Sequence, residues 1–271
     1  MGFFDKLKAS VGFGGAKVDL IINEKVINQG GIIEGTVKIT GGNLNQKLNK
    51  LKLQLYYRIE EIVQETVVVD YDRDGRIDDV EEHEHYDTNY ITIFKTETAH
   101  NTEIIKGEEQ EHPFTIEIPF NVPITDESIK WYLQAQADIP GAIDPRKTIE
   151  LEIIPSVGIQ AINELLEGMG FQMIEHGYED ESLFVVYKPT IQLKKFFDEL
   201  IVYFYEDENK IELKMEIDLK ERNVRDIFGS KFDTEQKLVR LTIPKKEIFT
   251  EEGNILHEVI EDYLKELFSS M

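Results

Sequence analysis

Residues 51–59 read Leu-Lys-Leu-Gln-Leu-Tyr-Tyr-Arg-Ile, and this stretch decides the fold class. An apolar side chain stands at every second position: Leu51, Leu53, Leu55, Tyr57 and Ile59. Successive side chains of a strand point to opposite faces, so this alternation indicates a strand with one buried face. The stretch therefore predicts a sheet that packs against a core on one side.

The same alternation recurs in Phe114–Ile118, Trp131–Ala137 and Ile149–Ile153. Glycine and proline residues separate these runs at close spacing, as at Gly41-Gly42 and Pro140-Gly141. Many short alternating strands with frequent turns favour an antiparallel sandwich over a parallel α/β sheet. The first half also has no apolar pattern long enough for repeated crossover helices, which supports the antiparallel assignment.

The pattern changes after Pro155, where we place a boundary between two domains, residues 1–155 and 156–271. Apolar residues from Ile159 to Met169 follow helical spacing. Alternating strands then resume, and the amphipathic tail from Ile255 to Phe268 predicts a closing helix. We therefore expect a mainly β chain with a short helix between two lobes and a helix at the C-terminus.

Composition limits the chemistry that the chain can perform. The 271 residues are 41% hydrophobic and include no cysteine, which excludes disulfides, thiolate zinc sites and cysteine nucleophiles. The first residues have no long apolar core of a secretory signal, and no later apolar run is long enough to span a bilayer. A cytoplasmic location is the expectation.

The net charge of −23 comes from 53 acidic and 30 basic residues. A field of this sign repels nucleic acid and anionic lipid and favours basic partners or cations. We therefore expect protein partners, no nucleic acid partner and no membrane contact. Whether the chain forms a homodimer is left open.

Three segments resemble motifs of arrestin-like domains in order and spacing. Residues 28–37 resemble the family's early Pro-Gly-x-x-Val-x-Gly-x-Val signature. Gly107 followed by residues 113–119 resembles its later Gly…Pro-Phe-x-Phe-x-Leu-Pro strand, and residues 131–138 are similar to its final alternating strand. With residues 2–7 at the start, the chain resembles the bacterial sporulation-control branch of the arrestin-like group.

This resemblance implies two tandem arrestin-like antiparallel β-sandwich lobes and a non-enzymatic regulatory role in early sporulation. Gln29 stands where the family usually has proline, which we interpret as a loss of turn rigidity only. The acidic stretch after Val69 is not part of the arrestin pattern, so the resemblance lends it no support.

That acidic stretch has the register of a calcium-binding loop. Calcium prefers six to eight oxygen ligands, which a twelve-residue loop supplies from positions 1, 3, 5, 7, 9 and 12. The corresponding residues are Asp70, Asp72, Asp74, the carbonyl of Arg76, Asp78 and Glu81, with Gly75 at the sharp turn. A match at every position predicts a metal site with Ca²⁺ as the candidate ion.

Two other interpretations of this stretch stay open. Asp74-Gly75 also suits the turn of an acidic hairpin that binds no ion. His83 and His85 lie two residues apart near Glu81 and could hold zinc or nickel, although a solvated His-x-His is the simpler interpretation. The flanks are strand-like, so a lone loop here should bind calcium only at about 10⁻⁴ to 10⁻³ M.

The sequence contains no Gly-x-Ser-x-Gly elbow and no phosphate loop ending in Gly-Lys-Ser/Thr. Our hypothesis is therefore a regulatory scaffold that is not an enzyme and that binds other proteins through strand edges and loops. One rival is a calcium- or metal-responsive module using residues 70–81, and another is a hydrolase built on clustered carboxylates. The N-terminal helical face formed by Phe3, Phe4, Leu7 and Val11 could dock on a membrane or another subunit, or could pack on the first lobe.

Overall fold

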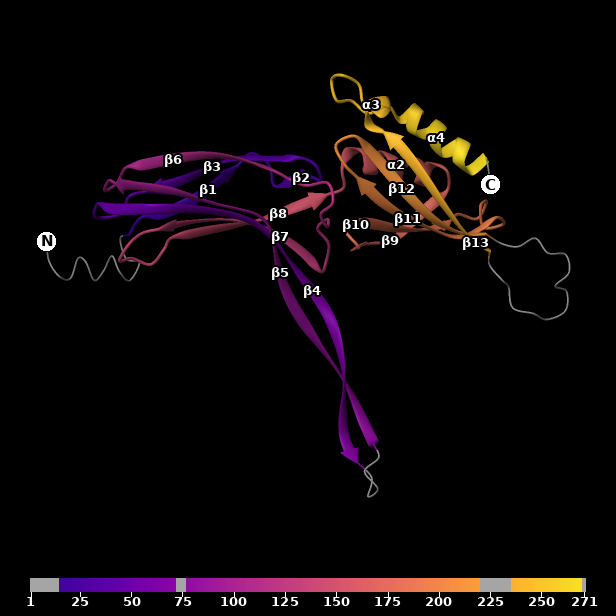
Figure 1. Ribbon diagram of the computed structural model, residues 1–271, viewed down its shortest axis with the longest axis horizontal. Helices are drawn as coiled ribbons and strands as arrows, with labels where there is room; N and C mark the ends of the chain where they lie inside the picture. Colours follow the sequence, from indigo (N-terminus) through magenta and orange to yellow (C-terminus); the bar gives the residue numbers. More distant parts are fainter. Residues whose placement is uncertain (1–14, 72–76, 220–234, 270–271) are drawn as a thin grey trace. The chain divides into compact units, whose positions relative to one another are not determined.

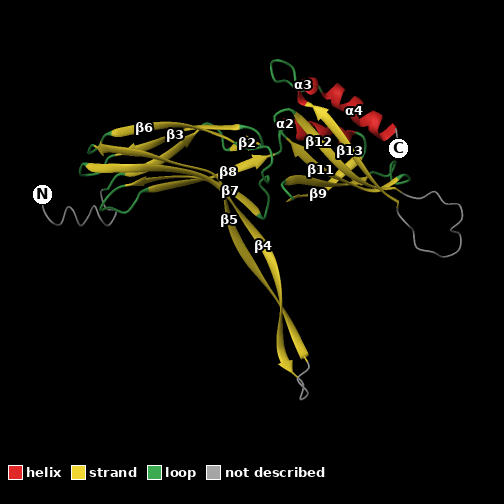
Figure 2. Ribbon diagram, viewed as in Figure 1, coloured by secondary structure: helices red, strands yellow, loops and turns green. Residues whose placement is uncertain are grey.

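The computed structural model describes residues 15–71, 77–219 and 235–269, without the side chains of residues 62, 64–83, 99–100, 219 and 235–236. The chain divides into two compact units. Unit 1 consists of residues up to 27, 33–116 and 125–152, and unit 2 consists of residues 28–32, 117–124 and the chain from 153 onward. Strands dominate both units (Figure 2), which confirms the predicted mainly β class.

The first eight strands precede the first described helix. They are β1 (Lys17–Ile22), β2 (Val26–Asn28), β3 (Ile32–Thr40), β4 (Gln46–Tyr71), β5 (Ile77–Ile104), β6 (Glu109–Glu117), β7 (Ile129–Asp138) and β8 (Arg146–Ile154). The later elements are α2 (Val157–Gly168), β9 (Phe171–Glu179), β10 (Ser182–Pro189), β11 (Phe197–Glu206), β12 (Lys210–Leu219), β13 (Glu235–Pro244), α3 (Lys245–Ile248) and α4 (His257–Ser269).

Two sheets with the strand orders β1-β3-β6 and β2-β8-β7-β4-β5 form the framework of unit 1. Antiparallel register sets Leu55 opposite Leu133 and Tyr57 opposite Trp131. The alternating residues of β7 that include Trp131, Leu133 and Ala135 are completely buried. The apolar half of each alternating strand therefore forms the core, as the sequence pattern predicts.

One five-stranded antiparallel sheet, with the order β13-β12-β11-β10-β9, organises unit 2. Helices α2 and α4 lie on one face of this sheet (Figure 2), and Ile162, Leu166, Ile260 and Leu264 are buried against it. The predicted helices at 159–169 and 255–268 are thus confirmed as α2 and α4. Their apolar stripes close the core of unit 2.

The structure bears on two further features considered from the sequence, the N-terminal apolar face and membrane-spanning segments. The apolar face of Phe3, Phe4, Leu7 and Val11 lies outside them entirely. Within the described residues, no helix combines the length and the apolar character that crossing a membrane requires.

Candidate functional site

Strands β4 and β5 form a ribbon that continues past the sheet. Their antiparallel pairing runs from Gln46 opposite Ile104 to Tyr71 opposite Ile77. Strand β7 accompanies β4 only over Lys50–Ile59. Beyond Ile59, β5 is the only described strand that pairs with β4, and the two strands project as a two-stranded ribbon (Figure 1). At roughly 3.3 Å per residue, its twelve residues per strand span about 40 Å.

The predicted calcium ligands lie at the end of this ribbon. Asp70 belongs to β4, while Asp78 and Glu81 belong to β5. The other three, Asp72, Asp74 and Arg76, lie outside the described residues. Among the side chains that the structure describes, no group of three or more histidine and acidic residues is arranged to hold a metal ion.

The backbone register constrains how such a site could form. Asp70 pairs with Asp79, and Glu81 pairs with Val67. In extended strand, the backbones of Asp78 and Glu81 are separated by about 10 Å, whereas carboxylate oxygens bind calcium at about 2.3–2.6 Å. Calcium binding by the complete ligand set therefore requires the first residues of β5 to leave their strand conformation.

Nearer the sheet, most of the described side chains of the ribbon are exposed to solvent, while Glu60 and Val63 are half-buried. Glu84, His85 and Asp87 are exposed, and Tyr86 is 72% exposed. Tyr90, just beyond the two-stranded part, is 65% exposed. Tyrosine is enriched in protein interfaces, where its ring is buried and its hydroxyl stays hydrogen-bonded. The ribbon thus combines acidic and aromatic groups on an accessible surface.

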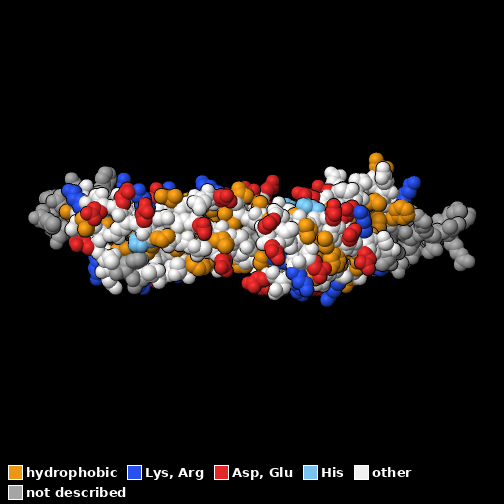
Figure 3. Space-filling model, turned by 90° about the horizontal axis from the view of Figure 1, so that it is seen from above, with side chains coloured by type: hydrophobic (Ala, Val, Ile, Leu, Met, Phe, Trp, Pro, Cys, Tyr) orange, Lys and Arg blue, Asp and Glu red, His pale blue; other side chains and the backbone are white. Residues whose placement is uncertain are grey.

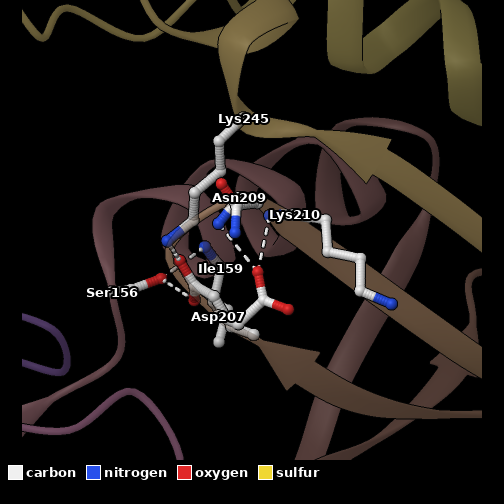
Figure 4. Close-up of polar contacts among 7 residues, drawn as sticks. Ser156, Ile159, Asp207, Asn209, Lys210 and Lys245 are labelled. Atoms are coloured by element: carbon white, nitrogen blue, oxygen red, sulfur yellow. Dashed lines mark hydrogen bonds and ion pairs between the residues drawn. The ribbon is translucent and has the colours of Figure 1, made fainter.

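A second polar arrangement lies inside unit 2, where Ser156 and Lys245 (Figure 4) both contact Glu206. Ser156 caps α2, because its hydroxyl oxygen accepts a hydrogen bond from the backbone N–H of Ile159 at 3.2 Å. The same hydroxyl donates to Oε2 of Glu206, the last residue of β11. Lys245 Nζ lies 2.8 Å from Oε1 of Glu206, so both carboxylate oxygens have partners.

Burial controls the electrostatics of this cluster. The Glu206 side chain is 3% exposed and that of Lys245 is 13% exposed. Burial raises the pKa of Glu206 above its ordinary value, while the hydrogen bonds from Lys245 and Ser156 oppose the rise. By contrast, the Asn209 backbone N–H holds the pKa of the neighbouring Asp207 carboxyl below its ordinary value, with help from Lys210.

This arrangement is suited to holding segments together. Ser156 connects the start of α2 to the end of β11, and Lys245 adds the start of α3. The Lys245 backbone N–H also donates to the Asn209 carbonyl at 2.8 Å. Both carboxylate oxygens of Glu206 have protein partners and its side chain is 3% exposed, so the carboxylate is poorly accessible to a reacting molecule.

Lys245 also contacts a turn formed by residues 28–31 and 117–122. Its Nζ lies 3.5 Å from the centre of the Phe120 ring, a cation–π distance. The Phe120 ring occupies the space where a side chain on Gly30 would be, and Gly30 has a φ of +73°. The Gly31 N–H donates to the Asn28 carbonyl, and the Ile118 N–H donates to the Gly31 carbonyl.

Gln29 has a structural role in this turn that the sequence did not reveal. Its side chain is 3% exposed, and its Nε2 donates to the Val122 carbonyl. Its backbone N–H donates to the Ile154 carbonyl at 2.9 Å. The substitution of glutamine for the usual proline thus supplies two donors that proline lacks, so the interpretation as a loss of rigidity alone is incomplete.

Comparison with known proteins places this architecture in a family. The family model described as SpoOM protein matches residues 4–222, which include the ribbon, Ser156 and Glu206. The chain belongs to the SpoOM protein family. Lys245, α3 and α4 lie beyond the residues that the SpoOM model matches.

A full-length SpoOM relative extends the match over almost all of the chain. The sporulation-control protein spo0M of Bacillus subtilis (strain 168) is 29% identical over 274 residues, covering 97% of this chain and 98% of that protein. The crystal structure of Spo0M from Bacillus subtilis covers 95% of this chain and 99% of its own, with a TM-score of 0.63 and 25% identity. These matches bear out the resemblance inferred from the motifs and agree with tandem arrestin-like lobes.

Proposed function

We propose that this SpoOM protein is a non-enzymatic, cytoplasmic regulator of sporulation that acts by binding other proteins. The regulatory role is supported by similarity to a sporulation-control protein along nearly the full length of both chains. In the Glu206 cluster the charged groups bind one another, which fits a structural role for this cluster.

The β4–β5 ribbon is the observation that carries the protein-binding role. Most of its described side chains are exposed, and acidic residues lie along both of its strands. A two-stranded ribbon also offers backbone N–H and C=O groups along its outer edges for strand addition by an extended segment. We therefore expect a basic partner whose binding weakens as salt screens the charges.

The ribbon-dependent interaction can be tested with a shortened variant. Glu61 and Asp87 are opposite each other in the register, so residues 62–86 can be replaced by an Asn-Gly turn that joins them. Pull-down from the native cytoplasm should recover at least one protein with the full-length chain and lose it with the shortened variant.

The shortened variant should keep the fold, because the deleted residues lie beyond the part of β4 that pairs with β7. Its thermal unfolding temperature is the control. Recovery of the same partners with both chains, or of no reproducible partner with either chain, would contradict the proposal.

Calcium binding at residues 70–81 is a second candidate function, favoured by the complete match to the twelve-residue ligand pattern. Titration calorimetry should detect binding with a Kd of about 10⁻⁴ to 10⁻³ M. The double substitution Asp70→Ala and Glu81→Ala should abolish that heat, because it removes the first and the bidentate last ligand.

A matched variant with His83→Ala and His85→Ala should keep the calcium heat and would instead reduce binding of zinc or nickel. Amide exchange should accelerate at residues 77–81 on calcium addition, since these residues must leave β4. Absence of heat at millimolar calcium, or unchanged heat in the Asp70/Glu81 variant, eliminates this function.

A further inference from the structure

The loop between β10 and β11 is a well-anchored turn on the surface of unit 2. The backbone N–H groups of Leu193 and Lys194 both donate to the Thr190 carbonyl at 3.0 Å. The Thr190 N–H donates to the Gly170 carbonyl at 2.8 Å, and the Leu193 side chain packs against the core. These contacts anchor the backbone of the loop to the rest of unit 2.

This loop borders an open recess of about 530 Å³. The lining residues are Gln172, Lys188, Pro189, Thr190, Ile191, Gln192 and Lys194. None of them is acidic, although 53 of the 271 residues in the chain are. Two ammonium groups, two amides and a hydroxyl provide hydrogen-bond donors around one hollow, which is the chemistry that binds a phosphate.

The rim of the recess is basic and apolar at the same time. Ile191, which lines the recess, is 84% exposed. Lys195 lies between Lys194 and Phe196 and is also exposed, and no ion pair joins Lys194 or Lys195 to another described residue. Lys188 has Glu199 at 3.8 Å, a distance at which water screens an exposed pair. Exposed apolar side chains flanked by lysines are typical of surfaces that enter a bilayer interface.

We infer that this surface docks on an anionic bilayer: the recess receives the phosphate of a lipid headgroup while Ile191 enters the interface. A free phosphate would satisfy the donors but would leave Ile191 in water. A bilayer satisfies both the lysines and the apolar rim. The inference is independent of the protein-binding role of the ribbon.

The expectation of no membrane contact rests on the net charge of −23, and acidic side chains are spread over the face of the molecule that Figure 3 shows. At physiological ionic strength, the interaction of exposed charges fades beyond about 8 Å, so the charges nearest the headgroups dominate. Lys188 and Lys194 line the recess, and Lys195 follows Lys194 in the same loop. The acidic residues that follow in the chain are Asp198 and Glu199, and Glu199 lies 3.8 Å from Lys188.

Vesicle co-flotation tests the inference with the full chain. Vesicles of phosphatidylcholine with phosphatidylglycerol should bind the protein, and pure phosphatidylcholine vesicles should bind much less. Lys194→Glu should lower the partition coefficient about tenfold, since each lysine near an anionic surface contributes appreciably to binding. Ile191→Ser should lower it several-fold on the same vesicles.

Matched controls are available in unit 1. Lys106→Glu changes the net charge equally at another exposed lysine, and Ile143→Ser removes an apolar side chain that is 64% exposed. Both should bind like the unchanged protein, and all four variants should keep its thermal unfolding temperature, because the altered side chains are exposed.

Three results would overturn the inference. Equal binding to both vesicle types would show that the anionic charge of the bilayer does not contribute to binding. Amide NMR shifts at Thr190–Lys194 with inorganic phosphate, together with no vesicle binding, would assign the recess to a soluble anion. The same shifts with a polyglutamate peptide, again without vesicle binding, would assign it to an acidic protein segment.

Discussion

Replacing Lys245 with methionine should lower the free energy of unfolding by about 3–5 kcal/mol, because it leaves the buried Glu206 carboxylate without its cation. Methionine preserves most of the volume of the lysine stem, so the loss comes from the charge and not from a cavity. The cation–π contact with Phe120 is lost as well. Chemical denaturation of the full chain measures the change.

The loss should also depend on pH. Burial raises the folded-state pKa of Glu206 above the ordinary value of 4.5, and removing Lys245 raises it further. A raised folded pKa gives a contribution to stability that is complete below 4.5 and is lost as the pH rises through the folded value. The deficit of the methionine variant should therefore be larger at pH 8 than at pH 5.5.

Two further variants make this prediction decisive. Glu206→Gln combined with Lys245→Met removes both charges while keeping an acceptor for Ser156, so it should recover part of the lost stability. Lys265→Met breaks an exposed pair with Glu261 at 2.6 Å and should leave the unfolding curve almost unchanged. Equal effects of Lys245→Met and Lys265→Met would contradict the role assigned to the buried pair.

Gly30→Ala should have a comparable effect and lower the free energy of unfolding by about 2–5 kcal/mol. A left-handed conformation costs a non-glycine residue about 1–2 kcal/mol, and overpacking adds about 1–3 kcal/mol. Both costs apply here, because Gly30 has a φ of +73° and its new methyl group would overlap the Phe120 ring. Thermal unfolding monitored by near-UV circular dichroism measures the loss.

Gly107 and Gly141 provide matched controls for the two costs. Their φ values are +73° and +75°, but no atom lies within 4 Å of an added Cβ at either position. Gly107→Ala and Gly141→Ala should therefore show only the conformational cost, about 1–2 kcal/mol. If Gly30→Ala is no worse than these two, the Phe120 ring moves aside and the close packing of the turn contributes little.

Much of the fold follows from local patterns in the sequence. Alternation predicted β4 near Leu53 and β7 near Trp131 because one face of each strand is buried. Strand β9 was not predicted, since it is an edge strand with exposed residues such as Ile174 and shows no regular alternation. The length of the ribbon was also not predictable, because beyond Ile59 no described third strand imposes a buried face.

The polar cluster of Ser156, Glu206 and Lys245 was harder to predict from the sequence. Ser156 could have been identified as a helix cap, because it stands between Pro155 and a helical apolar pattern. Glu206 and Lys245 could not have been identified as a pair, because each is one of many charged residues and their contact depends on tertiary packing. The calcium-ligand pattern at Asp70–Glu81 can be recognised in the sequence, and calcium binding there stays a prediction.

Unit 2 is assembled from three stretches of chain that are far apart in the sequence, 28–32, 117–124 and 153 onward. Recombination between the two halves of the gene could join the second half of one protein to the first half of another. The second half would then be separated from the Gly30 and Phe120 with which it packs. Lys245 would then contact residues of the other protein instead of the Phe120 ring. We therefore expect the two halves to be inherited together and to diverge in step, unlike modules that evolution shuffles freely.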